Sequence, residues 1–289
     1  MMSVIKNQIE NEGYTEVIGS KARWLSINWL EIWVYKDLLY MLVKRDFVTF
    51  YKQTILGPLW FIFQPIIMTF TYVIIFGNIA GISTDGVPQF LFYLSGITLW
   101  SYFSESLTKV STVFKDNANM FGKVYFPRLI MPMSIVVSGL IKLGIQFGIF
   151  LCVLAYYVIF KGNIHPNIWA LAIPLLIFLL ALQSLGVGMI ISSLTTKYKD
   201  LVFLVTFGIQ LFMFVTPVIY PSSILPANFK LIFQLNPLTG IFECFRYGFL
   251  GAGAFQPYML FYSALNAVVI FLLGTLIFNK VEKDFMDTV

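Results

Sequence analysis

The chain has 289 residues, of which 58% are hydrophobic and only 11% are charged. A soluble domain carries roughly 25% charged residues. The 30 Phe, 15 Tyr and 6 Trp together outnumber the 19 Lys and Arg and the 14 Asp and Glu. This composition excludes a soluble globule, which needs more charge on its surface, and a disordered chain, which needs fewer apolar residues. With a mean hydropathy of +0.82, it indicates a polytopic membrane protein.

Cysteine and histidine are too scarce for a disulfide scaffold or a zinc site. The sequence holds Cys152, Cys244 and one histidine, His165, with no HExxH or CxxC motif and no cluster of Asp and Glu. We therefore expect no metal site and no catalytic residue. In a membrane protein, a net charge of +5 is explained first by basic residues that set the topology, so it does not require a nucleic-acid partner.

Six stretches are long and apolar enough to cross a bilayer, because a helix needs about 20 apolar residues to span roughly 30 Å of hydrocarbon. None shows the alternation of barrel strands. The expected fold is therefore an all-α polytopic membrane protein with six transmembrane helices. The six predicted spans are Gly57 to Gly77, Phe90 to about Lys109, Ile130 to Phe160, Ile168 to Leu194, Leu201 to Tyr220, and Gln256 to Phe278.

Basic residues are distributed unequally between the two sides of these spans. Fifteen of the 19 Lys and Arg precede the first span, follow the last, or lie between spans 2 and 3 or spans 4 and 5. By the positive-inside rule these segments are cytoplasmic, so both termini are expected in the cytoplasm. Residues 1–56 then form a cytoplasmic N-terminal segment, 57–280 the six-span domain and 281–289 a cytoplasmic tail.

Residues 26–52 mix charged and apolar side chains, unlike the spans that follow. Leu30, Val34, Leu38 and Met41 repeat at helical spacing and are flanked by Trp and Tyr. This pattern predicts an amphipathic interface helix that lies on the cytoplasmic membrane face and leads into span 1. The alternative is a soluble helix docked on a partner protein.

Residues 221–254, between spans 5 and 6, contain two apolar pieces that are each too short to cross the membrane. Asn236-Pro237 separates them and favours a turn. We expect a re-entrant helical hairpin in the outer leaflet, in which Glu243 and Arg246 pair and so lower the cost of burial. The alternative is an ordinary surface loop.

Five motifs follow one another from about residue 36 to the C-terminus. They are Lys44-Arg45-Asp46 with Tyr51-Lys52, Leu56 to Trp60 and Gln64-Pro65; Lys123 to Arg128 with Pro132; Tyr198-Lys199-Asp200-Leu201; Thr216 to Pro221; and Asn236 to Gly240 with Arg246. In this order the sequence resembles the ABC transporter permeases that export bacterial polysaccharides, such as O-antigen, teichoic acid or capsule.

The resemblance implies a homodimer of permeases in the bacterial inner membrane, each docked to a separate ATPase subunit, that exports a lipid-linked polysaccharide, with O-antigen the first choice. The chain has no GxxxxGK[ST] phosphate loop, so ATP and Mg are expected on the ATPase and no cofactor on this chain. One alternative keeps the fold but exports teichoic acid, capsule polymer, a drug or a lipid. Another is a membrane-embedded transferase acting on a lipid-linked sugar through Asp85, Glu105, His165 or Glu243.

Coupling to an ATPase requires a rigid cytoplasmic element that transmits its closure. Residues 117–128 are basic and aromatic, so they predict a coupling helix with Phe126 as exposed aromatic anchor and Arg128 as charged contact. The alternative is that Lys123 and Arg128 only determine topology. The predicted ATPase contacts are Asn117, Phe121, Lys123, Tyr125, Phe126, Arg128, Tyr198, Lys199 and Asp200.

Sugar rings have apolar C–H faces, so a glycan path favours aromatic side chains. The resemblance implies that spans 1 and 5 border the path, although aromatic residues also face lipid. The predicted path residues are Trp60, Phe63, Gln64, Ile67, Phe70, Phe207, Gln210, Phe214 and Tyr220. The predicted external gate residues are Pro217, Pro221, Asn236, Pro237, Glu243 and Arg246.

Polar residues inside the spans are costly in hydrocarbon and therefore candidates for function. Lys142 has three open interpretations: it faces a wet path, pairs with Glu105, or extends to an interface. The small residues of the Gly144/Gly148 and Gly188/Ser192 patterns predict close packing within the chain. The glutamines either bind glycan or join helices, and they are Gln64, Gln146, Gln183 and Gln210.

Overall fold

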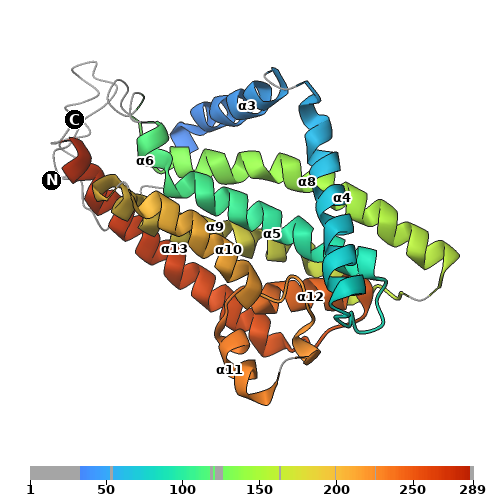
Figure 1. Cartoon of the computed structure of the whole chain (residues 1–289). Helices are drawn as coiled ribbons and strands as arrows, with labels where there is room; N and C mark the ends of the chain where they lie inside the picture. Colours follow the sequence, from blue (N-terminus) through green and yellow to red (C-terminus); the bar gives the residue numbers. More distant parts are fainter. Residues whose placement is uncertain are drawn as a thin grey trace, which may run out of the picture.

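A computed structural model describes residues 33–52, 55–117, 120, 126–162, 164–198, 200–224 and 226–286 (Figure 1). All regular secondary structure in these ranges is helical, which confirms the all-α class. The main helices are α3 (Lys36–Lys52), α4 (Trp60–Tyr72), α5 (Gln89–Ser111), α6 (Val113–Asp116), α8 (Ile130–Phe160), α9 (Ile173–Lys197), α10 (Leu201–Val215), α11 (Ala227–Leu235), α12 (Thr239–Leu250) and α13 (Pro257–Met286). Short turns η1 (Gly57–Leu59), η3 (Ile168–Ala172) and η4 (Ser222–Ile224) and a π-helix, η2 (Val73–Ile79), complete the order.

Four helical segments of the described chain are long and apolar enough to cross a membrane. They are Gly57–Ile79, Ile130–Phe160, Ile168–Lys197 and Pro257–Val281, and they correspond to predicted spans 1, 3, 4 and 6. The other two predicted spans differ for separate reasons. Helix α10 has only 15 residues, while α5 has 23 but mixes Ser, Thr, Glu105 and Lys109 with its apolar residues.

The polar character of α5 follows from its position at the centre of the bundle. It packs against α8 and α9 and also contacts α4, α10 and α12. Leu91 to Trp100 are buried without a break. A helix surrounded by protein needs no lipid-facing stripe, so it tolerates Ser95 and Thr98, whose hydroxyls bond to backbone carbonyls one turn earlier.

Glycines bring α9 and α13 into backbone contact. A Cβ added to Gly274 would lie 2.4 Å from the carbonyl oxygen of Gly186, and one added to Gly186 would lie 2.7 Å from the backbone nitrogen of Phe271. Such close approach is possible only without side chains at both positions. These two glycines, which the sequence patterns did not single out, therefore fix the α9–α13 packing.

The two predicted small-residue patterns have different outcomes. A Cβ on Gly188 would lie 2.6 Å from Val110 of α5, which confirms intrachain packing at that site. A Cβ on Gly144 or Gly148 would meet nothing within 4 Å, so intrachain packing was the wrong expectation there. The difference arises because sequence spacing places residues on one face of a helix but does not say what that face contacts.

Replacing Gly274 by alanine should therefore destabilise the permease by about 1–3 kcal/mol, because the new methyl group would push α9 and α13 apart. Gly144→Ala is the matched control: its methyl group meets open space and raises helix propensity. Thermal unfolding of both purified variants in one detergent measures the difference. Equal unfolding midpoints for the two variants would show that the α9–α13 contact does not constrain the fold.

Helix α3 confirms a helix within the predicted residues 26–52, but the apolar residues of α3 and of the residues just before it divide between two faces. Leu38 packs towards the core together with Leu42, on the side where α3 contacts α8. Val34 and Met41, expected on the same stripe as Leu38, are 74% and 59% exposed. The exposed face is thus available to a membrane surface or a partner protein. The prediction for Leu30 lies outside the described residues.

The two ends of the bundle collect different segments. Helix α6, the C-terminal end of α13 and the start of α3 lie near one end, whereas α11 and α12 lie at the opposite end (Figure 1). Helices α11 and α12 are joined at residues 236–238, which confirms two helices where the hairpin was expected. Predicted cytoplasmic segments therefore gather at one end of the structure and the predicted gate at the other.

Candidate functional site

The predicted path residues of span 1 lie on an exposed face of α4. Trp60, Phe63, Ile67 and Phe70 are between 43% and 56% exposed, and Gln64 is exposed as well. On α10, Phe207 and Phe214 are similarly open. Tyr220, in the turn after α10, is half-buried and donates a hydrogen bond from its hydroxyl to the Phe214 carbonyl. Two helices thus present aromatic faces that the rest of the described chain does not cover.

A cavity of about 640 Å³, here called the α10 cavity, lies between α4, α5 and α10. Of the nine predicted path residues, Gln210 and Phe214 line it. Trp100 of α5 and Met68 of α4 also line it, and sequence reasoning missed both. The missed signal is the close spacing of Trp100 with Ser104 and Thr108, which form a mixed aromatic and polar wall on α5.

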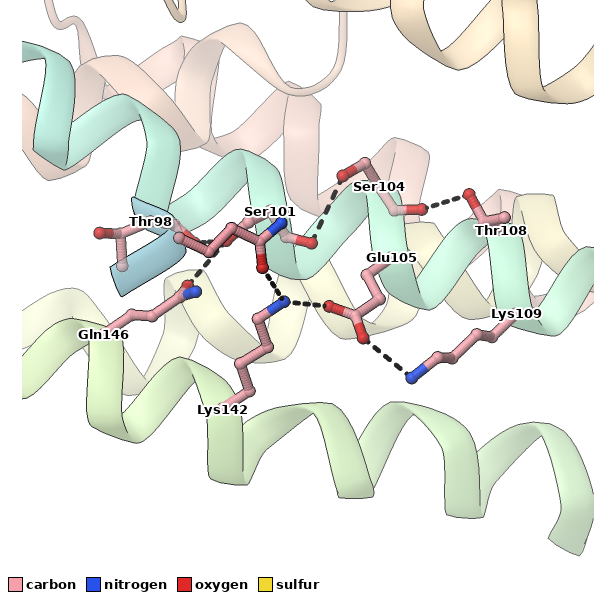
Figure 2. A network of polar contacts seen from close by, with 9 residues as sticks. Thr98, Ser101, Ser104, Glu105, Thr108, Lys109, Lys142 and Gln146 are labelled. Atoms are coloured by element: carbon pink, nitrogen blue, oxygen red, sulfur yellow. Dashed lines mark hydrogen bonds and ion pairs between the residues drawn. The ribbon is translucent and has the colours of Figure 1, made fainter. Parts of the chain in front are cut away.

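Figure 2 shows the ionic cluster at the centre of this region, where Lys142 extends from α8 towards Glu105 on α5. The Lys142 Nζ atom lies 2.7 Å from Glu105 Oε2 and donates a 3.2 Å hydrogen bond to Gln64 Oε1 of α4. Lys109 pairs with the other carboxylate oxygen at 2.8 Å. Of the three interpretations of Lys142, pairing with Glu105 is therefore confirmed.

Three of the four intramembrane glutamines join helices. Gln146 of α8 accepts a 2.7 Å hydrogen bond from Ser101 of α5, and Gln183 of α9 donates a 3.2 Å bond to Asn266 of α13. Gln64 accepts from Lys142, as described above. Gln210 is exposed in the α10 cavity and remains the candidate for contact with a substrate.

A second cavity of about 590 Å³, here called the α3 cavity, lies between α3, α4, α5, α6 and α8. Lys142 lines it, and Glu105 and Lys109 line both cavities. The ionic cluster is therefore part of the wall that the two cavities share.

At the opposite end of the bundle, Asn236 ties the α11–α12 turn to the end of α10. Its Nδ2 atom donates to the Val215 carbonyl at 3.1 Å and to Thr216 Oγ1 at 2.9 Å. Its Oδ1 atom accepts from the Leu238 backbone N–H at 2.9 Å. Pro237, next to it, is half-buried. This predicted gate residue is thus a structural link between two segments at this end of the bundle.

Arg246 and Glu243 are both buried, but no hydrogen bond or ion pair joins these two described residues. Arg246 Nη2 donates to the Val218 carbonyl at 2.6 Å, and its guanidinium lies 3.8 Å from the centre of the Phe92 ring. Glu243 accepts from the Ala254 backbone N–H at 2.9 Å. The expected pair is replaced because nearby non-helical backbone groups need partners.

The carbonyls that Arg246 binds belong to a turn built by prolines. Pro217 and Pro221 are buried, and the residues between them are not helical. Arg246 Nη1 also lies 3.4 Å from the Tyr220 carbonyl. A guanidinium offers several donors in one plane, so a single side chain can hold this turn against α12. The structure thereby brings the predicted gate residues together.

The predicted coupling contacts are described only in part, because Phe121, Lys123, Tyr125 and Lys199 lie outside the described residues. Phe126 is 4% exposed, so its expected exposure was wrong. Arg128 is also buried, at 6%. The reason is that Pro127 starts the turn into α8, where the Ile130 N–H bonds to its carbonyl at 3.0 Å.

The remaining coupling contacts differ in their accessibility. Asn117 is half-buried and donates to the Val113 carbonyl at 3.1 Å, which closes the end of α6. Tyr198 and Asp200 are exposed in the turn between α9 and α10. These two side chains are therefore the described members of the set that are free to meet a protein partner.

The sequence profile of the ABC-2 type transporter family matches residues 37–250. The chain belongs to this family. The O-antigen export system permease protein RfbA of Klebsiella pneumoniae is 28% identical over 253 residues, covering 87% of this chain and 94% of that protein. RfbA of Myxococcus xanthus is 24% identical over 261 residues, covering 90% and 98%. The inner membrane transport permease YadH of Escherichia coli K12 is 24% identical over 226 residues, covering 76% and 84%.

Family membership confirms the resemblance that the ordered motifs indicated. Together with the apolar helices, it makes the chain an integral membrane protein and an ABC-2 permease homologous to O-antigen export permeases. Its relatives are named as permease components, so the family implies a transporter with an ATPase partner rather than an enzyme in this chain.

Proposed function

We propose that this permease is the membrane subunit of an ATP-driven exporter that carries lipid-linked polysaccharide, O-antigen first, from the cytoplasm across the bacterial inner membrane. The observation that carries the proposal is the near full-length similarity to two O-antigen export permeases, over 87% and 90% of this chain. The similarity to YadH, whose name gives no substrate, covers 76% of this chain. The exposed aromatic faces of α4 and α10 suit a sugar chain that slides between them.

The proposed architecture has six spans with both termini in the cytoplasm. Helix α10 rises about 22 Å over its 15 residues, and the non-helical residues 216–220 extend it, with two of their carbonyls bound by Arg246. Helix α12 has 12 residues and so rises about 18 Å, which is too short to span. Its nearly complete burial supports a re-entrant hairpin of α11 and α12 rather than a surface loop.

Two copies of the permease and two ATPase subunits form the proposed exporter. The uncovered apolar faces of α4 and α10 support a homodimer whose glycan path runs between copies. ATP and Mg bind the ATPase subunits, and the permease itself carries no cofactor. The predicted coupling segment 117–128 and the α9–α10 turn, with Tyr198 and Asp200, contact the ATPase.

Export of teichoic acid, capsule polymer, a drug or a lipid would use the same fold and remains the alternative to O-antigen. The transferase alternative gains no support from two of its candidates, Glu105 and Glu243. Glu105 is held by two lysines and Glu243 is buried. Acid–base chemistry needs a group that exchanges protons with a substrate. In this structure the two lysines occupy the Glu105 carboxylate, and Glu243 lies away from solvent.

Removing the side chains of Tyr198 and Asp200 together should lower the amount of ATPase that copurifies with the permease by about tenfold, as expected for interface contacts worth roughly 1–2 kcal/mol. The permease itself should still insert and purify, because both side chains are exposed. Lys161→Ala, at an exposed residue directly after α8 and outside the predicted ATPase contacts, is the control. Unchanged copurification of the ATPase would remove the α9–α10 turn from the proposed contact.

Loss of the gene tests the function itself. Cells without the permease should lose surface polysaccharide and accumulate undecaprenyl-linked polymer inside, and the cloned gene should restore export. Compositional analysis of the retained polymer distinguishes O-antigen from teichoic acid or capsule. Unchanged surface glycan in the deletion strain would refute the proposed function.

A further inference from the structure

The ionic cluster carries one uncompensated positive charge. Lys109 and Lys142 share the single carboxylate of Glu105, at 2.8 and 2.7 Å. Arg45 and Asp46, which also line the α3 cavity, neutralise each other at 2.8 Å. The Lys109 side chain is 58% exposed and that of Lys142 is 15% exposed, so the surplus charge borders open space in which an anion can meet it.

Asp116 is the remaining acidic residue on the wall of the α3 cavity, but it belongs to another part of it. It accepts a 2.6 Å hydrogen bond from Thr112 at the break between α5 and α6. It follows Lys109 by seven residues, or about 10 Å at the rise of a helix, and no ion pair joins these two described residues or joins Asp116 to Lys142. Asp116 therefore makes no direct contact with either ammonium group, and the surplus charge at the cluster persists.

The depth of the cluster matches the headgroup level of the inner leaflet. Lys142 precedes the end of α8 at Phe160 by 18 residues, or about 27 Å of helix. The hydrocarbon core of a bilayer is roughly 30 Å thick. With Phe160 at the outer surface, as proposed, the Lys142 ammonium lies near the inner boundary, where lipid phosphates are found.

Space for a ligand exists on both sides of the cluster. The α3 cavity, about 590 Å³, lies beneath the helix expected at the membrane surface, and the α10 cavity, about 640 Å³, lies next to the proposed path. Glu105 and Lys109 belong to the wall of both cavities. A headgroup in either cavity would therefore lie next to this cluster.

We infer that Lys142 and Lys109 form a binding site for the diphosphate headgroup of the lipid-linked substrate, with Glu105 as the internal anion that the diphosphate displaces. This inference rests on the proposed function, which supplies a lipid-linked glycan as substrate. Ammonium groups bind phosphate oxygens through charge-assisted hydrogen bonds. In the unloaded permease Glu105 neutralises part of their charge, so the site costs less to hold open than two free lysines would.

A cluster that binds an anion can be distinguished from one that only joins helices by removing its positive and its negative charge separately. If the ion pair only joins helices, removing either partner should harm the permease in the same way. If the cluster binds an anion, Lys142→Met should weaken binding of undecaprenyl diphosphate about tenfold, whereas Glu105→Gln should strengthen it several-fold. Lys142→Arg keeps the charge and should retain binding, and Lys280→Met, at an exposed lysine of α13, is the matched control.

The measurement is native mass spectrometry of the full permease purified with its ATPase, loaded with undecaprenyl diphosphate, undecaprenol, phosphatidylglycerol or inorganic pyrophosphate. We expect preference for undecaprenyl diphosphate over the other three. Equal binding of undecaprenol, phosphatidylglycerol or inorganic pyrophosphate would overturn a site for the lipid-linked diphosphate. Weaker binding in both Lys142→Met and Glu105→Gln, or unchanged binding in both, would also overturn it.

Two controls keep this result separate from protein stability and from the proposed function. Thermal unfolding of each variant shows whether it is folded, and Lys142→Arg provides the test if Lys142→Met is not. Surface glycan in cells reports the function independently. Normal export in wild-type cells with no diphosphate preference in the purified permease would refute the site while leaving the function in place.

Discussion

Arg246→Ala should destabilise the permease by about 3–5 kcal/mol, the range for breaking a buried charged contact by removing one partner. The substitution leaves the carbonyls of Val218 and Tyr220 without their donor and removes the cation that interacts electrostatically with the buried Glu243. It also removes the contact between the guanidinium and the Phe92 ring. We therefore expect the turn between α10 and α11 to detach from α12. The unfolding midpoint of the purified permease measures this loss.

Two further variants test whether the loss of stability comes from the buried guanidinium contacts of Arg246. Arg246→Lys keeps the charge but cannot donate to two carbonyls in one plane, so an intermediate loss of about 1–2 kcal/mol is expected. Arg45→Ala removes an exposed arginine paired with its neighbour Asp46 and should change stability by less than about 1 kcal/mol. If Arg246→Ala unfolds at the same temperature as Arg45→Ala, the buried contacts do not hold the turn between α10 and α11 against α12.

Phe126→Ala should cost about 3–5 kcal/mol of stability, as for a large aromatic residue removed from a packed core. Phe126 is 4% exposed and belongs to the main hydrophobic cluster of the described residues. The matched control is Phe203→Ala, because Phe203 is 80% exposed on α10 and its removal leaves no cavity. Chemical denaturation followed by tryptophan fluorescence compares the two variants.

This prediction changes how the coupling segment can be tested. Loss of ATPase from a Phe126→Ala permease would follow from unfolding as well as from a lost contact. A stable Phe126→Ala variant that still fails to bind the ATPase would instead restore Phe126 as a docking residue and contradict its assignment to the core. Stability must therefore be measured before copurification.

Helix positions were largely predictable because they follow from local properties. Long apolar runs must form helices in hydrocarbon, where backbone groups have no water to bind. The described structure accordingly has span-length apolar helices at predicted spans 1, 3, 4 and 6. The turn at Asn236 was also predictable, since Asn-Pro disfavours a continuous helix.

Contacts between helices were less predictable. The sequence left three possible environments for Lys142. Only the fold shows that Glu105, 37 residues earlier on another helix, lies beside it, with 2.7 Å between Lys142 Nζ and Glu105 Oε2. Gly144 and Gly148 have the spacing of a packing motif but face open space. Gly186 and Gly274, 88 positions apart in the sequence, form the close contact instead.

The predicted site residues divide in the same way. Exposure of the aromatic residues on α4 and α10 agrees with a path along spans 1 and 5, and that path remains a prediction. The gate residues were brought together as a group, but Arg246 binds backbone carbonyls rather than Glu243. Spacing of three on a helix allowed the pair, and the nearby proline-containing turn offered Arg246 partners that the spacing could not reveal.

The sequence by itself determined the membrane class, the family and most helix boundaries, because apolar run length and ordered motifs are local properties of the chain. The tertiary structure decided which faces are buried, since burial depends on residues far apart in the sequence. It placed Phe126 in the core, gave Lys142 its partner and put Glu105 and Lys109 between two cavities. A surplus positive charge beside space for a ligand emerges only when α3, α4, α5 and α8 are packed together.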